Sequence, residues 1–212
     1  MNLADLRRDY AHEQLDEAHC LLDPIQQFAK WFAEAQASEC REPNAMTLAT
    51  ADAEARPSAR IVLLKGFDSD GFVFFTDFRS RKGTELTSNP RAALVFHWHE
   101  LERQVRITGA AHRIDGATTE AYFRSRPEGS QHGAWASHQS AILSGREVLE
   151  QEWQRRALEF AGRDVPVPPH WGGFRVVPDE MEFWQGRPNR LHDRLFYQRT
   201  PEPQWRRVRL SP

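Results

Sequence analysis

The spacing of apolar residues changes along the chain, from helical near the N-terminus to strand-like from Met46 onward. Asp23 followed by Pro24 is typical of a helix N-cap and first helical residue, and the apolar side chains that follow recur at helical spacing up to about Ala37. From Met46, short runs of β-branched and aromatic residues alternate with turn residues, as in a meander of antiparallel strands. We therefore predict one amphipathic helix followed by a sheet.

Short strand-like runs fill most of the segment between residues 46 and 114. They are MTLAT, RIVLLK, FVFFT, RAALVFHW and ERQVRITGAAHRI. Among them, SRKGTEL indicates a short helix that Asn89 and Pro90 end. About six short strands with few helices favour a barrel or sandwich over alternating βαβ units.

The middle of the chain is predicted to be helical. TTEAYFRSR before Pro127 indicates a short helix, and Ser144 with Glu147 forms a capping-box pattern ahead of a second helix that Gly162 ends. VPVPPHWGG then predicts a stiff linker. Four strands are expected to return to the sheet after it: FRVV, MEFW, LFYQ and WRRVRL. We find no internal repeat and no domain boundary in this pattern.

A chain of 212 residues with 40% hydrophobic side chains can bury a core without a metal or a disulfide to hold it together. Its apolar runs fall short of the roughly 20 residues that cross a membrane, and its N-terminus has no apolar segment typical of a secretory signal. Cys20 and Cys40 offer neither a disulfide framework nor metal-ligand spacing. These features predict a cytoplasmic protein with no membrane segment.

The net charge of −2 hides an acidic N-terminal part and a basic C-terminal part. Residues 1–58 carry 5 Lys and Arg against 11 Asp and Glu, whereas residues 175–212 carry 8 against 5. Nonspecific nucleic-acid binding depends on summed neutralisation of phosphates, which the acidic part opposes, so we expect no nucleic-acid partner. A small anionic ligand needs only a few cations. Of the 28 cationic side chains 25 are arginines, whose planar fork suits phosphate and carboxylate.

Two cationic clusters have the composition of phosphate sites. Arg60 and Lys65 stand at the two ends of the apolar strand RIVLLK, where they could reach separate anionic groups. Ser80, Arg81 and Lys82 bring a hydroxyl, two cations and free backbone N–H groups to a helix start. Charged strand ends and exposed basic turns have the same patterns, so each cluster by itself leaves a solvated surface as the alternative.

Tyr122, Arg126 and Ser130 form a second candidate anion site. Tyr122 and Arg126 share a helix face at i, i+4 spacing, and Ser130 follows just after the break at Pro127. The three side chains can therefore reach one ligand. A surface ion pair is the alternative role for Arg126.

Arg190, His192 and Arg194 alternate in the segment RLHDR, so an extended chain would place them on one side. Their mutual repulsion favours a bound anion or an electron-rich ring there, with a basic surface loop as the alternative. His97 and His99 have an i, i+2 spacing on a predicted strand, but spacing identifies no third ligand and the chain has no HExxH or paired CxxC motif. We therefore expect no metal.

Seven motifs give the chain a close resemblance to the pyridoxine (pyridoxamine) 5′-phosphate oxidase family, from about Leu6 to the C-terminus. They are, in order, RIVLLK, SRK, LERQV, YFRSRP, WGGFRV, EFWQG and RLHDR. The resemblance implies a mainly β split β-barrel FMN-binding fold with peripheral helices, as one domain over residues 1–212, and a homodimer with FMN at the subunit interface. The implied reaction oxidises pyridoxine or pyridoxamine 5′-phosphate to pyridoxal 5′-phosphate with O₂, releasing H₂O₂ and, from the amine, ammonia.

The resemblance also implies roles for individual residues. Those implied to bind FMN are Arg60, Ile61, Val62, Leu63, Leu64, Lys65, Phe75, Thr76, Arg81, Lys82, Gln104, Gln139, Ser140, Trp184 and Arg194. Those implied to bind substrate are Arg7, Tyr10, Lys65, Tyr122, Arg126, Ser130, Arg190 and His192, of which the last two are the implied catalytic residues and hold the substrate ring over the flavin. Residues 1–20 are implied to form a mobile segment that covers the substrate. Many members of the family have Tyr where this chain has Phe75, so a hydroxyl is missing there.

Three other functions stay open at this stage. A flavin- or deazaflavin-dependent reductase of the same fold would act on another substrate, but it would have no use for the combined set of Tyr122, Arg126, Ser130, Arg190 and His192. A noncatalytic flavin or pyridoxal phosphate binding protein would release no H₂O₂ on addition of substrate. A nucleic-acid-binding surface of Arg and Trp predicts a colourless protein whose binding is sensitive to salt.

Overall fold

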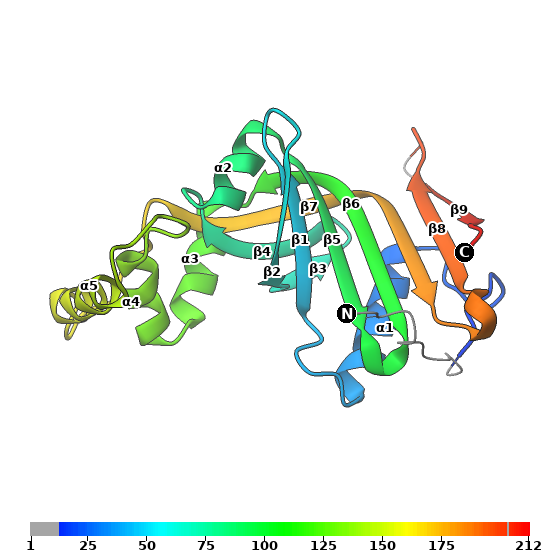
Figure 1. Ribbon diagram of the computed structural model, residues 1–212, viewed down its shortest axis with the longest axis horizontal. Helices are drawn as coiled ribbons and strands as arrows, with labels where there is room; N and C mark the ends of the chain where they lie inside the picture. Colours follow the sequence, from blue (N-terminus) through cyan, green and yellow to red (C-terminus); the bar gives the residue numbers. More distant parts are fainter. Residues whose placement is uncertain (1–12, 203) are drawn as a thin grey trace, which may run out of the picture.

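The structure, a computed structural model, describes residues 13–202 and 204–212. These residues form a curled antiparallel sheet with helices around it (Figure 1). Hydrogen-bonded neighbours follow the order β2-β1-β5-β6-β7-β4-β3, and β8 joins β7 to β9. The strands are β1 (Ala45–Ala51), β2 (Pro57–Leu63), β3 (Gly66–Asp68), β4 (Gly71–Asp77), β5 (Arg91–Trp98), β6 (Arg103–Arg113), β7 (Trp171–Gln185), β8 (Asp193–Arg199) and β9 (Trp205–Arg209). The helices are α1 (Pro24–Ala37), α2 (Arg81–Ser88), α3 (Gly116–Ser125), α4 (Glu128–Ala136) and α5 (Arg146–Glu159), with short 3₁₀ turns η1 (His99–Leu101) and η2 (Pro188–Arg190).

Helix α1 begins and ends where the sequence predicts. Oδ1 of Asp23 accepts the backbone N–H of Ile25 at 2.7 Å, as an N-cap does. Phe28 is completely buried and packs edge-on against Phe72 and Phe96, with ring centroids 4.9 and 5.0 Å apart. The apolar face of α1 therefore becomes part of the main core under the curled sheet.

The segments FRVV and MEFW, predicted as two strands, belong to one 15-residue strand, β7. The break that Pro178 suggests is instead a β-bulge, at which the register with β6 shifts between Thr108 and Gly109. Glycine is required at 109, because a Cβ there would lie 2.0 Å from the carbonyl oxygen of Val177. Strand β7 thereby runs from the end of the molecule that holds α3, α4 and α5 to the end that holds β8 and β9 (Figure 1).

Helices α3, α4 and α5 lie together at one end of the sheet, and a second apolar cluster forms beside it (Figure 1). Helix α3 is confirmed ahead of Pro127. Helix α5 is confirmed too, but its predicted capping box is wrong: Gly145, not Ser144, is the N-cap, and no side chain caps it. The sequence did not predict α4, because its two glycines and few apolar positions give only a weak helical pattern.

Residues 13–20 lie against the β8–β9 hairpin at the other end of the molecule. Arg209 donates hydrogen bonds to both oxygens of Glu17 at 2.9 and 2.7 Å and to Asp193 at 2.8 Å. It also donates to the carbonyl oxygen of Leu15 at 3.1 Å. This single guanidinium therefore fixes the start of the described chain to its C-terminal hairpin. Within the described residues, no helix is both long and apolar enough to cross a membrane.

Candidate active site

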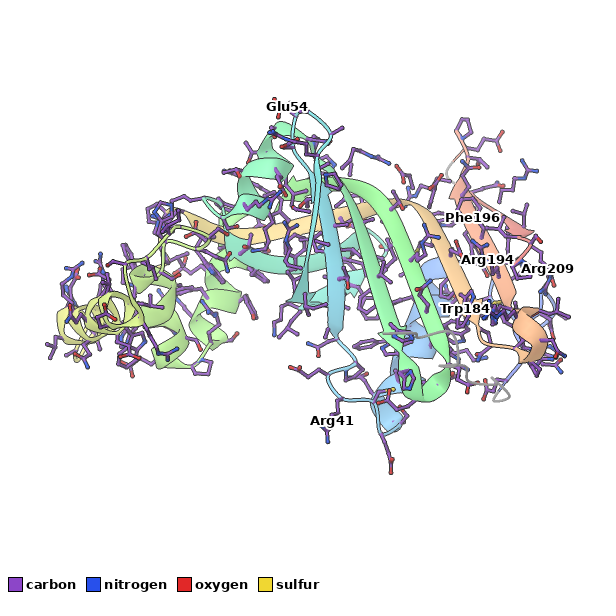
Figure 2. The ribbon with its side chains drawn as sticks, viewed as in Figure 1. Arg41, Glu54, Trp184, Arg194, Phe196 and Arg209 are labelled. Carbon is purple, nitrogen blue, oxygen red and sulfur yellow. The ribbon has the colours of Figure 1, made fainter. Side chains whose placement is uncertain are left out.

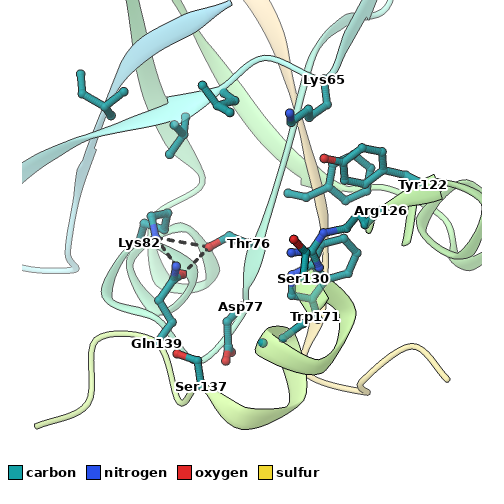
Figure 3. A pocket seen from close by; sticks show the side chains of 16 residues that line it. Lys65, Thr76, Asp77, Lys82, Tyr122, Arg126, Ser130, Ser137, Gln139 and Trp171 are labelled. Carbon is teal, nitrogen blue, oxygen red and sulfur yellow. Dashed lines mark hydrogen bonds between the residues drawn. The ribbon is translucent and has the colours of Figure 1, made fainter. Parts of the chain in front are cut away.

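A pocket of about 460 Å³ opens between β2, β4, α2, α3 and α4 (Figure 3). It gathers eleven of the residues that the sequence singled out: Ile61, Val62, Leu63, Lys65, Phe75, Thr76, Lys82, Tyr122, Arg126, Ser130 and Gln139. Five further lining residues were not anticipated: Asp77, Gly133, Ala134, Ser137 and Trp171. Members of both cationic clusters and of the candidate site formed by Tyr122, Arg126 and Ser130 thus face a single cavity.

One end of the pocket is built on the first turn of α2. Nζ of Lys82 donates to Oε1 of Gln139 at 2.9 Å and to Oγ1 of Thr76 at 3.3 Å (Figure 3). Ser80 is the N-cap of α2, as its place at the helix start predicts, and the backbone N–H of Arg81 donates to Oγ of Ser140 at 3.2 Å. Burial lowers the pKa of Lys82, with a further contribution from the charge of Arg60. This end combines a buried ammonium with a helix N-terminus, an arrangement that suits a phosphate group.

The other end of the pocket holds Lys65, Tyr122, Arg126 and Ser130 (Figure 3). The guanidinium of Arg126 lies over the ring of Trp171, with its Cζ 4.8 Å from the ring centroid. Its Nη1 is buried and has no hydrogen-bond partner among the described residues. Burial lowers the pKa of Arg126. An unpartnered buried cationic donor is costly in free energy unless an anion satisfies it, so this end also suits a phosphate.

Stacked aromatic rings form the wall between the two ends. Phe75 lies 3.9 Å from Tyr122 and 5.3 Å from Trp171, measured between ring centroids, and the ring planes are within 24° and 15° of parallel. Phe75 carries no hydroxyl, so its contribution to the wall is apolar. Such a wall suits a planar ligand. Trp171, which contacts both Phe75 and Arg126, lies within the predicted linker VPVPPHWGG, but the structure places it at the start of β7. Only the resemblance of WGGFRV marks this residue.

Asp77 places a carboxylate on the pocket lining, where it would oppose an anion. Arg79 neutralises it with hydrogen bonds from Nη2 at 2.7 Å, from Nε and from its backbone N–H. Burial raises the pKa of Asp77, but these bonds outweigh it and the net pKa lies below the ordinary value. Nη2 of Arg79 also donates to the carbonyl oxygen of Ser137 at 3.3 Å, so the pair ties β4 to the end of α4.

Three predicted FMN contacts stand just outside the pocket lining and one lies in the core. Arg60, Arg81 and Ser140 surround the α2 end, where Arg60 and Arg81 share the carboxylate of Glu85. Leu64 is buried, with 5% of its surface exposed. Its side chain belongs to the main core, so any contact of Leu64 with a ligand in the pocket would be through its backbone.

The remaining predicted residues gather at the other end of β7, away from the pocket lining: Gln104, Trp184, Arg190, His192 and Arg194. Gln104 pairs with Trp184 across β6 and β7. Trp184 pairs with Arg194 across β7 and β8, and Figure 2 labels both residues. We call these five residues the distal cluster. At about 3.3 Å per residue, β7 from Trp171 to Trp184 measures roughly 40 Å along the strand. Within one chain, the pocket and the distal cluster therefore lie near opposite ends of β7.

The segment RLHDR is not extended, so the predicted alternation of its cations on one side is wrong. Arg190 lies in η2 with a φ of 62°, after Asn189 with a φ of 57°, and both values belong to the left-handed region. Arg194, on β8, turns to the buried Glu182, with Nε to Oε1 at 2.9 Å. The turn thus separates Arg190 from the strand that carries Arg194.

The hydrogen bond that holds the ring of His192 requires Nδ1 to be unprotonated. Its Nδ1 accepts the backbone N–H of Arg187 at 3.1 Å, and its ring lies 4.7 Å from that of Trp184. Burial and the charge of Arg190 lower its pKa below the ordinary 6.5, although Asp193 acts in the opposite direction. His192 is therefore a neutral imidazole at neutral pH, and because Nδ1 is an acceptor, its hydrogen is on Nε2, which is a donor.

Two of the predicted substrate contacts, Arg7 and Tyr10, lie outside the described residues. Within residues 13–202 and 204–212, no group of three His, Cys, Asp or Glu side chains could hold a metal ion. The chemistry of the described site thus rests on cationic donors, aromatic rings and His192.

The curled antiparallel sheet and a pocket with two cationic ends define a split-barrel protein whose site suits a planar, anionic ligand. The family model for pyridoxamine 5′-phosphate oxidase matches residues 32–158, and that for the pyridoxine 5′-phosphate oxidase C-terminal dimerisation region matches residues 171–212. The chain belongs to the pyridoxamine 5′-phosphate oxidase family, as its motifs predict.

Curated relatives match over nearly the full length of the chain. A pyridoxine/pyridoxamine 5′-phosphate oxidase of Cupriavidus necator is 56% identical over 210 residues, covering 99% of each chain. One of a Cyanothece species is 55% identical over 212 residues, covering 100% of this chain and 99% of the relative.

Two solved structures support the fold. PhzG from Burkholderia lata, in complex with tetrahydrophenazine-1-carboxylic acid, is 33% identical with a TM-score of 0.88, over 94% of this chain and 98% of that one. A pyridoxamine 5′-phosphate oxidase-related, FMN binding protein from Nostoc punctiforme is 18% identical with a TM-score of 0.72, over 91% and 100%. The predicted mainly β, split-barrel fold with peripheral helices is confirmed.

Proposed function

We propose that this chain oxidises pyridoxine or pyridoxamine 5′-phosphate to pyridoxal 5′-phosphate, with FMN as cofactor and O₂ as electron acceptor. The observation that carries this proposal is the pocket with two separate cationic ends, because FMN and the substrate each bring one phosphate. The full-length relatives named for this activity support it.

The residues present fit the two ligands. The flavin phosphate is proposed to bind at the α2 end, near Lys82 and the backbone N–H groups of its first turn. The substrate phosphate is proposed to bind at the other end, where the buried Nη1 of Arg126 needs an anionic partner. When bound, FMN supplies the acceptor for the substrate's hydride and passes the electrons to O₂. The protein's own task is to hold two planar rings together and keep both phosphates fixed.

The complete site is proposed to need two copies of the chain. The distal cluster cannot reach the pocket of its own chain along the length of β7, so it would complete the pocket of a second copy. The cluster lies on β6 to β8, and all but Gln104 fall within residues 171–212, the segment that matches a dimerisation region. A two-fold dimer would then contain two equivalent sites, each with a pocket from one subunit and a distal cluster from its partner.

In that arrangement, His192 would face the substrate as a neutral imidazole. Because Nδ1 of His192 accepts the backbone N–H of Arg187, the neutral ring carries its hydrogen on Nε2. Nε2 would therefore donate a hydrogen bond to the substrate, and Arg190 would orient the substrate ring.

The purified protein is expected to be yellow and to contain one FMN per chain, because the pocket offers one flavin phosphate site per subunit. The measurement is the visible spectrum together with the flavin released on denaturation and the mass of the native particle. A colourless monomer that cannot be reconstituted with FMN would contradict the proposed function.

His192→Asn is expected to slow flavin reduction by about tenfold, as for loss of one hydrogen bond that positions the substrate. In the wild type, the rate should fall as the pH drops through the lowered pKa of His192, because protonation of Nδ1 removes the acceptor of the Arg187 N–H that holds the ring in place. Asn can still accept the Arg187 N–H but does not titrate, so this fall should disappear in the variant. Anaerobic stopped-flow absorbance between pH 5 and pH 8 measures both effects. Identical pH profiles in the wild type and the variant would show that the fall in rate does not arise from His192.

A further inference from the structure

A carboxylate between β1, β2 and α2 is almost completely buried but lies outside the pocket lining. The side chain of Glu85 is 5% exposed and accepts hydrogen bonds from four donors on three different elements. Oε2 accepts from Thr50, from Ser58 at 2.6 Å and from Arg60 Nη2 at 3.3 Å. Oε1 accepts from Arg81 Nε at 2.9 Å.

Glu85 stays ionised in spite of its burial. Burial by itself raises its pKa, but the hydrogen bonds from Ser58, Thr50 and Arg81 and the charge of Arg60 outweigh it and bring the pKa to about 2. A buried carboxylate with so many donors is a fixed anchor rather than a mobile surface charge. Its two guanidinium partners are the residues next to the α2 end of the pocket.

The two arginines come from different elements and share this one anchor. Arg60 projects from β2, and its Nη1 also donates to Thr50 and to the carbonyl oxygen of Leu48. Arg81 stands in the first turn of α2, and its side chain is 61% exposed although its Nε is held by Glu85. The anchor therefore fixes the stem of Arg81 and leaves the rest of its guanidinium accessible to an anion at the start of α2.

We propose that Glu85 is a positioning residue for the phosphate of the flavin nucleotide, which acts by holding Arg60 and Arg81 beside the first turn of α2. This inference rests on the proposed function, because it takes FMN as the ligand of the α2 end. Glu85 does not touch the ligand. It sets the direction in which two cationic side chains present their donors.

Charge and position predict opposite effects of removing Glu85. As a negative charge beside an anion site, Glu85 weakens phosphate binding, so its removal alone would tighten the site. As an anchor, it preorganises two guanidinium groups, so its removal would loosen the site. The sign of the change in affinity therefore decides between the two roles.

The test uses the full-length protein freed of flavin and titrated with FMN and with riboflavin, which lacks the phosphate. Quenching of flavin fluorescence gives each Kd. Glu85→Ala is expected to raise the Kd for FMN by about tenfold, as for loss of one charge-assisted contact, and to leave the Kd for riboflavin within about twofold. Glu85→Gln, which keeps the size and one acceptor oxygen, is expected to lie between wild type and Glu85→Ala.

Two further variants make the result specific. In a protein that already carries Arg81→Ala, adding Glu85→Ala should change the ratio of the Kd for FMN to the Kd for riboflavin less than it does in the wild type. The reason is that one of the two guanidinium groups that Glu85 positions is already absent. Glu150→Ala is the matched control, since Glu150 accepts from Arg146 at the same i, i+4 spacing on α5 but lies outside the pocket lining. It should leave both Kd values unchanged.

Tighter or unchanged FMN binding in Glu85→Ala would overturn the inference, and so would equal weakening of FMN and riboflavin, which indicates a structural role alone. If Glu85→Ala does not fold, Glu85→Gln carries the same comparison. A wild-type protein that binds riboflavin as tightly as FMN, or binds neither, would overturn the proposed function itself. The failure of the inference and the failure of the function are thus distinguishable.

Discussion

Arg126→Ala is expected to weaken binding of pyridoxine 5′-phosphate by roughly ten- to a hundredfold while the FMN content stays nearly the same. The guanidinium is buried over Trp171 with an unpartnered Nη1, so its loss removes a charge-assisted contact worth about 1.5–3 kcal/mol. Equilibrium titration of the anaerobically reduced holoenzyme, which cannot oxidise pyridoxine 5′-phosphate, measures the Kd. The absorbance of the oxidised flavin at a known protein concentration measures occupancy.

Arg124→Ala is the control for this experiment. Arg124 lies in the last turn of α3, of which Arg126 is the C-cap, but it faces Glu120 and Asp164 at the surface rather than the pocket. It should change substrate binding by less than about twofold, as is usual for an exposed ion pair. If Arg126→Ala lost flavin and substrate equally, the assignment of the two phosphates to the two ends of the pocket would be wrong.

Two variants are expected to restore activity when their subunits are mixed, if activity is measured at a substrate concentration below the wild-type Kd, where each variant alone is nearly inactive. Arg126→Ala damages the pocket and Arg190→Ala damages the distal cluster, which one chain holds at different ends of β7. In a mixed two-fold dimer, one site would carry both substitutions and the other neither. Random exchange of equal amounts should therefore recover about one quarter of the wild-type activity.

The measurement is H₂O₂ release after the two proteins are unfolded and refolded together, compared with each protein refolded alone. Mixing Arg126→Ala with Lys65→Ala is the matched control, because both residues line the pocket of the same chain. That mixture should recover nothing, since each of its sites lacks one of the two cations. Absence of recovery in the first mixture would place the distal cluster outside the active site of the partner.

Local signals predicted the elements whose boundaries are marked by single residues. Asp23 and Pro24 define the start of α1, and Ser80 and Asn89 bracket α2, because caps act within one turn of the chain. The continuity of β7 could not be predicted in this way. Its bulge is possible only because Gly109 on another strand leaves room for the displaced backbone.

The candidate site was predictable as separate clusters but not as one cavity. Lys65, Lys82 and Arg126 are recognisable as cations in suitable local patterns, whereas their convergence on one pocket depends on the pairing of distant strands. The contacts of Trp171 with Arg126 and of Glu85 with Ser58 and Arg60 are tertiary contacts that no local pattern marks. The turn at Arg190 was missed because non-glycine residues occupy its left-handed positions.

Strand β7 contributes residues to two different proposed active sites. This limits which insertions and deletions the strand can tolerate. Side chains alternate between the two faces of a strand, so one residue inserted between Trp171 and Trp184 would turn every later side chain of β7 to the opposite face. Strand β7 already contains one β-bulge, and Gly109 on β6 leaves room for the backbone of that bulge. Along this strand, we expect evolutionary variation to occur by substitution, while insertions and deletions are confined to the loops beyond its ends.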